Sequence, residues 1–456
     1  MRKEMFNHEI TILRDTYRRL LRRNAKVNLI KLTGKTHPAD LAEVFRHFST
    51  EEQIEIFSLM KENEHAAEFL VELDDALVIE LLENESFDRI ASIIKKAPTN
   101  DQSGILNILG DEKAQSIIEL LNADKQEEIA EIMGYPDDSA GTLMNTEVFT
   151  LHESITAGEA IKTLQDQEGA EMVFYLYITD DDDRLVGVIS LRALTTTPSS
   201  TKLKDMMIKN IHSIRPETDQ EDVARIVAQY NFLAVPVLDS DSKLLGIVTV
   251  DDVVDVIREE ATEDFLRMAG AGKDREILLK SSWENAKARL PWLFASWIGG
   301  IGAASIIGAF ENMLANIVAL AAFIPVILGM GGNIATQSST IIVRGMATGR
   351  VNIGGEIKLI FKEIKVGLIL GSLYGILLGV FAKFTFTSAP DNLGFVVGLS
   401  ICASMVVAAT VGTIIPLILR KLDIDPAIAT GPFVTTSIDI LGVLFYFLIA
   451  GVFLKI

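Results

Sequence analysis

Cysteine is almost absent from this chain of 456 residues, and histidine is confined to its first half. There is one cysteine, Cys402, and all six histidines lie before residue 213. A single thiol can form neither an intrachain disulfide nor a zinc cluster of thiolates. A transition-metal site of cysteine and histidine is therefore excluded from the second half. The composition also excludes collagen, full disorder and disulfide-stapled scaffolds, and the charged first residues predict no cleavable secretory signal.

Positive charge is scarce in the middle of the chain. The net charge is −20 overall, but residues 1–35 carry +7, residues 36–280 carry −30 and residues 281–456 carry +3. We expect no nucleic-acid partner, because phosphate contacts need a basic surface. The acidity therefore belongs to one region, and the hydrophobicity described next belongs to another.

The last part of the chain contains five long apolar stretches. They cover about 290–310, 313–330, 364–382, 393–419 and 427–454. Each is long enough to cross roughly 30 Å of hydrocarbon. A soluble core could hold one such stretch, but five predict a membrane domain of α-helices.

Lysine and arginine gather in alternate connections between these stretches. The basic connections precede the first span, join the second to the third, and join the fourth to the fifth. Their cations are Lys287, Arg289, Arg344, Arg350, Lys358, Lys362, Lys365, Arg420 and Lys421. The opposite loops carry only Glu311, Lys383 and Asp391. The positive-inside rule then places residues 1–286 in the cytoplasm and the C-terminus outside the plasma membrane.

Two helical segments open the chain. Residues 36–136 have apolar residues at helical spacing between short polar breaks, and Ser49 to Glu52 has the pattern of a helix cap. This pattern predicts a helical superhelix or bundle. Residues 1–35 are basic and amphipathic, with a cluster at Arg18, Arg19, Arg22 and Arg23. The cluster could contact anionic lipid, form a solvated face or pair with the acidic region.

An internal repeat occupies residues 137–258. YLYITDDDDRLVGVISLRAL in the first copy matches VPVLDSDSKLLGIVTVDDVV in the second, with Gly187 equivalent to Gly246 and Met144 equivalent to Met207. Each copy predicts an extended piece, a helix, two strands joined by an acidic turn, and a second helix. The repeat resembles a tandem pair of CBS modules, with residues 137–200 as the first and 201–258 as the second.

The resemblance leaves ATP binding open. Such modules often hold a ribose hydroxyl with an Asp three residues after the Ser or Thr of the second strand. The second copy has Thr249 and Asp252, but the first has Ser190 and Ala193, which counts against ATP. The candidate nucleotide contacts are Tyr175, Arg192 and Phe232, which could equally be ordinary packing and surface residues. The string GAGKD at 270–274 lacks the pattern of a P-loop, so we expect no ATP hydrolysis by that route.

Two polar features interrupt the membrane stretches. Asp439 is the one acidic residue that the sequence places well inside a predicted span, and Gly431-Pro432 precedes it. An ionisable residue in a span is costly and usually functional, although a packing role beside Ser or Thr is the alternative. The second feature, PVILGMGGNIATQSS at 325–339, places Asn333 where the predicted second span ends; the alternative is a glycine-rich cap and turn.

These features together resemble the MgtE family of magnesium channels. The motif PxxxGxGGN runs here from Pro325 to Asn333, GPxxTxxxD runs from Gly431 to Asp439, and a plug-helix region covers 251–270. Ala335 departs from the glycine that the family often has there. The resemblance implies a homodimer and no enzymatic activity, with one pore between the second and fifth helices of both chains. Asp439 and Asn333 would then bind Mg²⁺, a hard cation that prefers oxygen ligands.

The acidic region then gains a regulatory role by resemblance. We expect Mg²⁺ to bridge its carboxylates and close the pore, which calls for a shift of a few kcal/mol. Asn231 stands where the family has an Asp, which would weaken one cytosolic site. The candidate regulatory ligands are Asp219, Glu221, Asp252, Asp255, Glu260, Glu263, Asp264 and Asp425.

The sequence thus predicts a multidomain protein of α and α/β parts with a polytopic α-helical membrane domain. In order, we expect a basic segment (1–35), a helical N-domain (36–136), two CBS modules, a connecting or plug helix (259–286) and five transmembrane helices (287–456). The predicted function is a Mg²⁺-selective channel or transporter gated by cytosolic Mg²⁺. The alternatives are a CBS-regulated secondary transporter of another divalent cation and a membrane-tethered nucleotide sensor.

Overall fold

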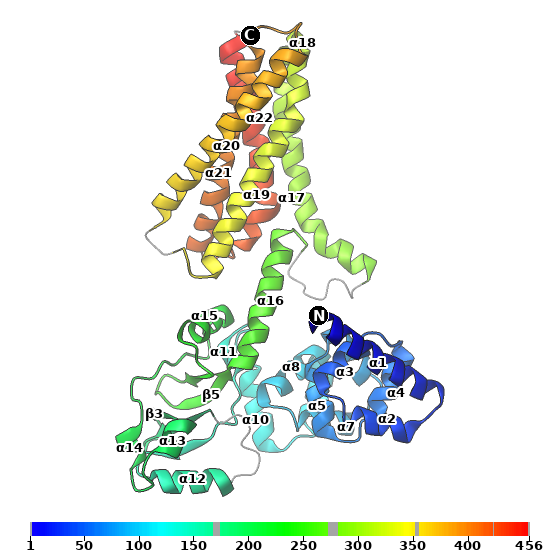
Figure 1. Ribbon diagram of the computed structural model, residues 1–456, viewed down its shortest axis with the longest axis vertical. Helices are drawn as coiled ribbons and strands as arrows, with labels where there is room; N and C mark the ends of the chain where they lie inside the picture. Colours follow the sequence, from blue (N-terminus) through cyan, green and yellow to red (C-terminus); the bar gives the residue numbers. More distant parts are fainter. Residues whose placement is uncertain (1, 167–173, 272–280, 352–354, 423, 455–456) are drawn as a thin grey trace. The chain divides into compact units, whose positions relative to one another are not determined.

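The computed structural model describes the chain except for residues 1, 167–173, 272–280, 352–354, 423 and 455–456 (Figure 1). It consists of two compact units, Met1–Ile257 and Arg258–Ile456. The long helix α16 (Val250–Met268) contributes to both units. The predicted connecting helix extended to residue 286, and its part at 272–280 lies outside the described residues.

The first unit begins with short helices, drawn in blue and cyan in Figure 1. Odd-numbered helices contact the next odd-numbered one from α1 to α9, and even-numbered helices do the same from α4 to α10. Two rows of stacked helices form a superhelix, as predicted. The helices are α1 (Arg2–Arg22), α2 (Lys26–Thr33), α3 (Pro38–Phe45), α4 (Thr50–Ser58), α5 (Asn63–Val71), α6 (Asp75–Leu82), α7 (Phe87–Ile94), α8 (Thr99–Leu109), α9 (Asp111–Ile118) and α10 (Ala123–Ile132).

Local sequence explains where these helices begin. Ser49 accepts the backbone N–H of Glu52, and the Glu52 carboxylate accepts the backbone N–H of Ser49, which is the predicted capping box. The core between the rows contains large aromatic rings, including the fully buried Phe45 and Phe69 packed edge to face at 4.9 Å.

The CBS pair completes the first unit. Strand β1 pairs in parallel with β2, β2 pairs antiparallel with β3, and β4 pairs antiparallel with β5. The elements are α11 (Ala140–Leu143), β1 (Thr150–His152), α12 (Ala157–Asp166), β2 (Tyr175–Thr179), β3 (Leu185–Ser190), α13 (Leu191–Thr196), α14 (Leu203–Met206), α15 (Gln220–Tyr230), β4 (Ala234–Leu238) and β5 (Leu244–Thr249).

The repeated glycines and methionines meet across the two modules. A Cβ on Gly187 of the first module would lie 2.3 Å from the Sδ of Met207, and a Cβ on Gly246 of the second would lie 2.8 Å from the Asn145 carbonyl oxygen, beside Met144. Strands β3 and β5, which carry these glycines, therefore each pack against the extended piece that opens the other module. Glycine is required there because a side chain would occupy the space of that piece.

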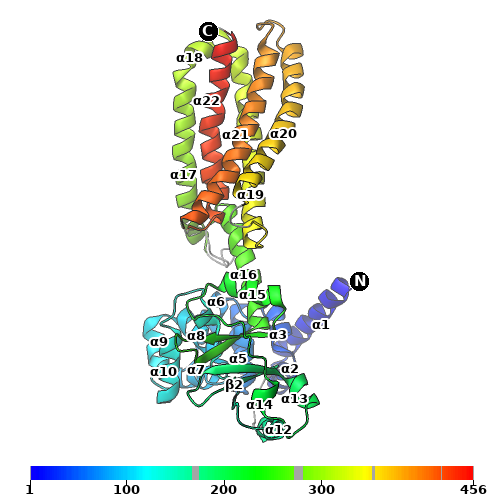
Figure 2. The ribbon, with the colours of Figure 1, turned by 90° about the vertical axis from the view of Figure 1, so that its left-hand side faces the viewer.

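The second unit contains the membrane helices, which run nearly parallel in Figure 2. They are α17 (Ser282–Ala309), α18 (Glu311–Asn316), a 3₁₀ turn (Val318–Phe323), α19 (Ile324–Ala347), α20 (Glu356–Thr385), α21 (Leu393–Lys421), a π-helical turn (Ala429–Phe433) and α22 (Val434–Leu454). Among the described residues, five spans are long and apolar enough to cross a membrane, as predicted.

The second span differs from the prediction in its position. It covers Val318–Ala347 rather than 313–330, so the PxxxGxGGN motif lies inside a continuous helix and not at an exit or a turn. Pro325 occupies the first turn of α19, where its missing N–H costs no hydrogen bond. Gly331 allows close packing, because a Cβ there would lie 2.8 Å from the Ile438 side chain of α22.

Candidate functional site

The membrane unit brings the two predicted pore residues to neighbouring helices. Asn333 lies on α19 and Asp439 on α22, and these helices contact each other through Gly331 and Ile438. Ile334 and Ile438 are almost fully buried, whereas Asn333 is exposed and Asp439 half-buried. The two polar residues therefore lie directly beside the apolar contact of α19 with α22.

Asp439 has no polar partner within the described part of the chain. The hydroxyl of Ser437 donates to the Phe433 carbonyl at 2.7 Å, and the hydroxyl of Thr435 donates to the Gly431 and Pro432 carbonyls. These two hydroxyls thus donate to backbone carbonyls of the preceding turn and not to Asp439. The packing role that the sequence left open for Asp439 is not seen here, and its carboxylate is free to bind a cation.

The start of α22 explains how Asp439 is positioned. Gly431 has non-helical dihedrals of φ −80° and ψ −126°, so the helix is interrupted at Gly431-Pro432 as predicted. The regular helix begins only at Val434, which places Asp439 in its second turn. The predicted fifth span had placed this residue deeper. An interrupted helix frees backbone carbonyls, which a membrane tolerates where they line a cavity.

One face of α19 is polar and uncovered. Asn333 and Gln337 are exposed, and Thr336 and Thr340 are half-buried. The opposite face packs on α21 and α22; it includes Ala335, the departure from the family motif, whose backbone meets Gly412 of α21. Ala335 therefore affects packing with α21 and does not replace a group on the exposed face. An uncovered amide in a membrane helix needs water or a second protein surface.

Glu363 is a second buried acid that the sequence reasoning missed. Its side chain is 5% exposed, and its Oε2 accepts the Ser338 hydroxyl at 2.9 Å. Asp439 is therefore not the one acid inside a span. The third span was predicted to start at 364, but α20 begins at Glu356 and carries Glu363 into the bundle. The charged string FKEIK resembled a loop, and no local signal marked its burial.

Predicted regulatory acids in the second unit gather around a cation. Arg267 of α16 pairs with Glu263 one turn away and with Asp425, in the segment that leads to α22. Burial, followed by the charges of Asp425 and Glu260, raises the pKa of Asp264 to about 6. The structure thus brings together Glu260, Glu263, Asp264 and Asp425. Sequence reasoning missed Arg267, which forms the direct link between α16 and Asp425.

A second acidic group lies between α8 and α16 in the first unit. Asp252 accepts the Asn100 amide at 3.1 Å and the Thr249 hydroxyl at 2.5 Å. Burial, followed by the charges of Asp252, Asp251 and Asp255, raises the pKa of Asp101 to about 7. Burial also raises the pKa of Asp252. Asp101 was missed because an acid in the first turn of a helix is expected as a dipole partner.

The remaining predicted regulatory residues lie at the ends of α15. Asp219 is the N-cap of this helix, and its carboxylate accepts the backbone N–H of Glu221 at 2.8 Å. Asn231 ends the helix in the left-handed conformation with φ 53°, which asparagine tolerates. In the described ranges, no group of three or more His, Cys, Asp or Glu has the arrangement of metal ligands.

The candidate nucleotide residues belong to both CBS modules. Tyr175 starts β2, Arg192 is exposed on α13, and Phe232 stacks on Tyr230 with ring centroids 5.4 Å apart. The Ser190 hydroxyl accepts the backbone N–H of Ala193 at 3.2 Å, so it acts as a helix cap. Ala193 offers no side-chain acceptor, which agrees with the doubt raised by the sequence.

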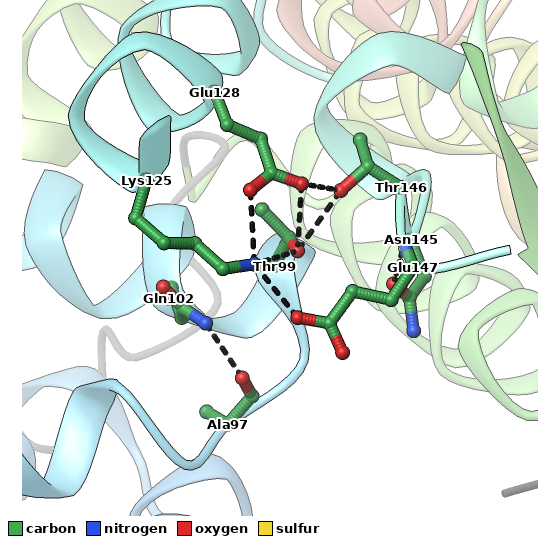
Figure 3. Close-up of polar contacts among 8 residues, drawn as sticks. All are labelled: Ala97, Thr99, Gln102, Lys125, Glu128, Asn145, Thr146 and Glu147. Carbon is green, nitrogen blue, oxygen red and sulfur yellow. Dashed lines mark hydrogen bonds and ion pairs between the residues drawn. The ribbon is translucent and has the colours of Figure 1, made fainter. Parts of the chain in front are cut away.

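A polar network joins the helical part of the first unit to the start of the CBS pair (Figure 3). Lys125 of α10 pairs with Glu128 at 2.9 Å and with Glu147 at 2.7 Å, and Thr146 bonds to Glu128 and Thr99. Burial opposes the charge of Lys125, but its bonds to Glu147 and Glu128 outweigh burial and raise its pKa. No local pattern predicted this network, because Thr99, Lys125 and Thr146 come from three separate segments of the chain.

Comparisons with known proteins agree with this organisation. Residues 324–449 match the MgtE family, described as a divalent cation transporter, residues 36–138 match the MgtE intracellular N domain, and residues 140–198 and 203–259 match the CBS domain. The magnesium transporter MgtE of Bacillus subtilis is 33% identical over 95% of this chain and 96% of its own length. That of Thermus thermophilus is 34% identical over 91% of this chain and 88% of its own length.

Solved structures resemble the first unit. The cytosolic domain of the Mg²⁺ channel MgtE in complex with ATP has a TM-score of 0.51 and 30% identity. The match covers 53% of this chain and 99% of that domain. With these matches and five candidate spans, the chain is a multi-pass membrane protein and a member of the MgtE family of divalent cation transporters.

Proposed function

We propose that this chain carries Mg²⁺ through a pore between α19 and α22 of two copies. The observation that carries the proposal is Asp439, a carboxylate on a membrane helix with no polar partner in the described part of the chain. The exposed amide of Asn333 lies on the adjoining helix. Relatives that match nearly the whole chain are named magnesium transporters. The family consists of transporters, not enzymes.

The oxygen-bearing side chains of the proposed pore, Asp439 and Asn333, suit Mg²⁺. This ion requires oxygen ligands in octahedral geometry and releases its water reluctantly. Asp439 on α22 and Asn333 on α19 supply a carboxylate oxygen and an amide oxygen. A hydrated ion held through its water molecules therefore fits this chemistry better than a soft metal, which would need cysteine or histidine.

The proposed homodimer follows from the uncovered face of α19. Asn333 and Gln337 cannot face lipid without losing their hydrogen bonds. A second copy related by a two-fold axis would place the same polar face opposite it and leave water between them. Two Asp439 carboxylates would then serve one pore.

We propose that cytosolic Mg²⁺ closes this pore through the acidic groups on α16. One group comprises Asp252 and Asp255 with Asp101, and the other comprises Glu260, Glu263, Asp264 and Asp425. Burial, followed by the charges of neighbouring carboxylates, raises the pKa values of Asp101 and Asp264, which supports a role for these acids in binding a cation. A divalent ion would relieve the repulsion among these charges and favour a compact arrangement. Asp219 and Glu221 complete the proposed set.

The remaining proposals concern location and nucleotide. We propose residence in the plasma membrane with residues 1–286 in the cytoplasm and the C-terminus outside, on the basis of the basic connections. We also propose the domain limits predicted from the sequence, which are 1–35, 36–136, 137–200, 201–258, 259–286 and 287–456. ATP is the candidate ligand of the CBS pair at Tyr175, Arg192 and Phe232, and we expect weak binding because Ala193 cannot accept a ribose hydroxyl. A relative's cytosolic domain has been solved with ATP.

Growth of a bacterial strain deficient in Mg²⁺ transport tests the function. The wild-type chain and Asp391→Asn, a matched change of an exposed acid in a loop, should support growth at low Mg²⁺. Asp439→Asn should fail although it reaches the membrane in equal amount. Growth supported by Asp439→Asn would contradict the proposed pore. A requirement for a proton or sodium gradient would point to a secondary transporter instead.

A further inference from the structure

The strongest unassigned surface lies on α1, α2 and the residues that directly follow each of them. Six cations are exposed there, and none forms an ion pair with a described carboxylate. They are Arg19, Arg22, Arg23, Lys26, Lys31 and Lys35. Together they make a strongly basic surface on a part of the chain that is otherwise acidic. We call these six residues the basic surface.

This surface is held firmly on the first unit. The buried Tyr17 ring of α1 packs against Phe48, and its hydroxyl bonds to Thr33 at 3.3 Å. Arg18 donates to the His47 carbonyl at 2.8 Å. Arg18 therefore serves the fold, whereas its neighbour Arg19 points outward. Figure 2 shows α1 at the side of this unit, with its N-terminal end projecting beyond the neighbouring helices. The basic surface is thus a folded feature and not a loose tail.

Among the described residues of the same unit, no carboxylate forms an ion pair with the basic surface. Asp15, the nearest acid on the same face of α1, pairs with Arg14 at 3.0 Å. The packing between α1 and α3 uses apolar side chains, so the cations are left toward solvent. The segment also precedes residue 36, where the match to the intracellular N domain begins.

Apolar side chains accompany the cations. Ile12 is 54% exposed, and helical spacing places it two turns before Arg19 on the same face. Val27 is 67% exposed and lies beside Lys26. An acidic protein surface would attract the cations but offers nothing to the two aliphatic chains. A phospholipid surface satisfies both, because aliphatic groups enter the boundary below the headgroups while cations remain at the phosphates.

We propose that the basic surface binds anionic phospholipid headgroups of the bilayer in which the chain is anchored. Anionic lipids attract protein cations that come within about one Debye length of the bilayer surface. Attachment to the same chain keeps the lipid at high effective concentration, so modest affinity suffices. The rest of the unit is acidic and is repelled, so the basic surface determines which side of the unit meets the lipid.

Full-length protein in lipid nanodiscs tests this proposal. Val27→Cys, in a Cys402→Ala background, carries a bimane label, and a nitroxide on the lipid headgroup quenches it at short range. We expect quenching in discs that contain phosphatidylglycerol and at least about threefold less in pure phosphatidylcholine, with loss of the difference at high salt. Equal quenching in the two lipids would overturn the proposal.

Two quadruple variants sharpen the test. R19Q/R22Q/R23Q/K26Q should lose the lipid-dependent quenching, whereas K95Q/K96Q/K162Q/K209Q removes four exposed cations elsewhere and should keep it. Quenching of the same label by aqueous iodide tests whether an acidic protein surface covers the basic surface instead of lipid. If the label is shielded from iodide in both lipids and becomes accessible only in R19Q/R22Q/R23Q/K26Q, the surface docks on an acidic protein surface, and the lipid proposal is wrong.

Discussion

Arg267, on α16, forms an ion pair with Asp425, in the segment that leads into α22. The same guanidinium holds Glu263, and Asp264 and Glu260 lie close enough to interact electrostatically. A cation of the protein thus occupies the centre of the acidic group that we propose for Mg²⁺. Protein cation and metal ion would compete for the same carboxylates.

Arg267→Gln should therefore increase the sensitivity of the second unit to Mg²⁺. Removal of one positive charge about 5 Å from a binding site changes the interaction energy by roughly 3 kcal/mol for each unit charge of the bound ion at an effective dielectric of 20. Solvent screening reduces this to about 1 kcal/mol, which is about fivefold in affinity. Hydrogen exchange of α16 against Mg²⁺ concentration should show the lower midpoint. Arg267→Lys keeps the charge and serves as control; an unchanged midpoint in Arg267→Gln would exclude competition.

Asp101 should make the stability of the first unit depend on pH. Its pKa is raised from 3.8 to about 7, by burial and then by Asp252, Asp251 and Asp255. The folded chain therefore binds a proton that the unfolded chain has released, so stability falls as pH rises from about 4 through about 7. Mg²⁺ affinity should rise over the same range, because the ion needs the ionised carboxylate.

Thermal unfolding in a chelator, measured across this pH range, tests that expectation. In Asp101→Asn the unfolding temperature should fall less steeply as the pH rises. Above pH about 7 it should be a few degrees higher than that of the wild type. Asp111→Asn, at an exposed acid in the first turn of α9, should retain the wild-type slope. Equal slopes in the two variants would show that Asp101 does not bind the proton.

Lys125→Ala should loosen the link between the superhelix and the CBS pair. The change leaves Glu128 and Glu147 without their cation in a partly buried network, at a cost of about 1–3 kcal/mol. Lys113→Ala is a suitable control, because its pair with Glu83 is exposed at 3.5 Å and should be worth less than about 1 kcal/mol. Chemical denaturation should give a lower free energy of unfolding for Lys125→Ala than for Lys113→Ala. The reverse order would show that the network contributes little to the stability of the first unit.

Two adjacent glycines of α17 should respond differently to alanine. A Cβ on Gly299 would lie 1.6 Å from the Cγ2 of Thr436 on α22, whereas a Cβ on Gly300 would meet nothing within 4 Å. Gly299→Ala should therefore destabilise the detergent-solubilised protein by about 1–3 kcal/mol through overpacking. Gly300→Ala should be neutral. Fluorescence-detected size exclusion after heating compares them, and similar melting of both variants would show that α17 does not pack as described.

Much of the architecture could be predicted because its signals are local or periodic. Long apolar stretches gave the five spans, and the repeat of Gly187 and Gly246 gave the CBS pair. The position of the second span was wrong, because a 3₁₀ turn of apolar residues precedes Pro325 and the polar string after it remains helical. Hydropathy alone cannot distinguish a polar helix face from the end of a helix.

The parts of the site that escaped prediction depend on contacts between distant residues. Asp101 becomes notable only because α8 packs beside Asp252, and Glu363 only because α20 starts early and meets Ser338. Arg267 was read as part of a charged helix, and its partner Asp425 lies 158 positions away. Each resembles an ordinary surface charge until the fold is known. Asp439 could be proposed from the sequence because an acidic residue is exceptional inside an apolar span.

Mg²⁺ flux into liposomes is the most direct test of the central claim. Purified wild-type chain and Asp439→Asn are reconstituted at equal density with a trapped Mg²⁺-sensitive dye, and Mg²⁺ is added outside. The account predicts rapid dye response with the wild type and with Asp391→Asn, and a response with Asp439→Asn at least about tenfold slower. Equal flux through Asp439→Asn and the wild type would contradict a pore that runs past Asp439.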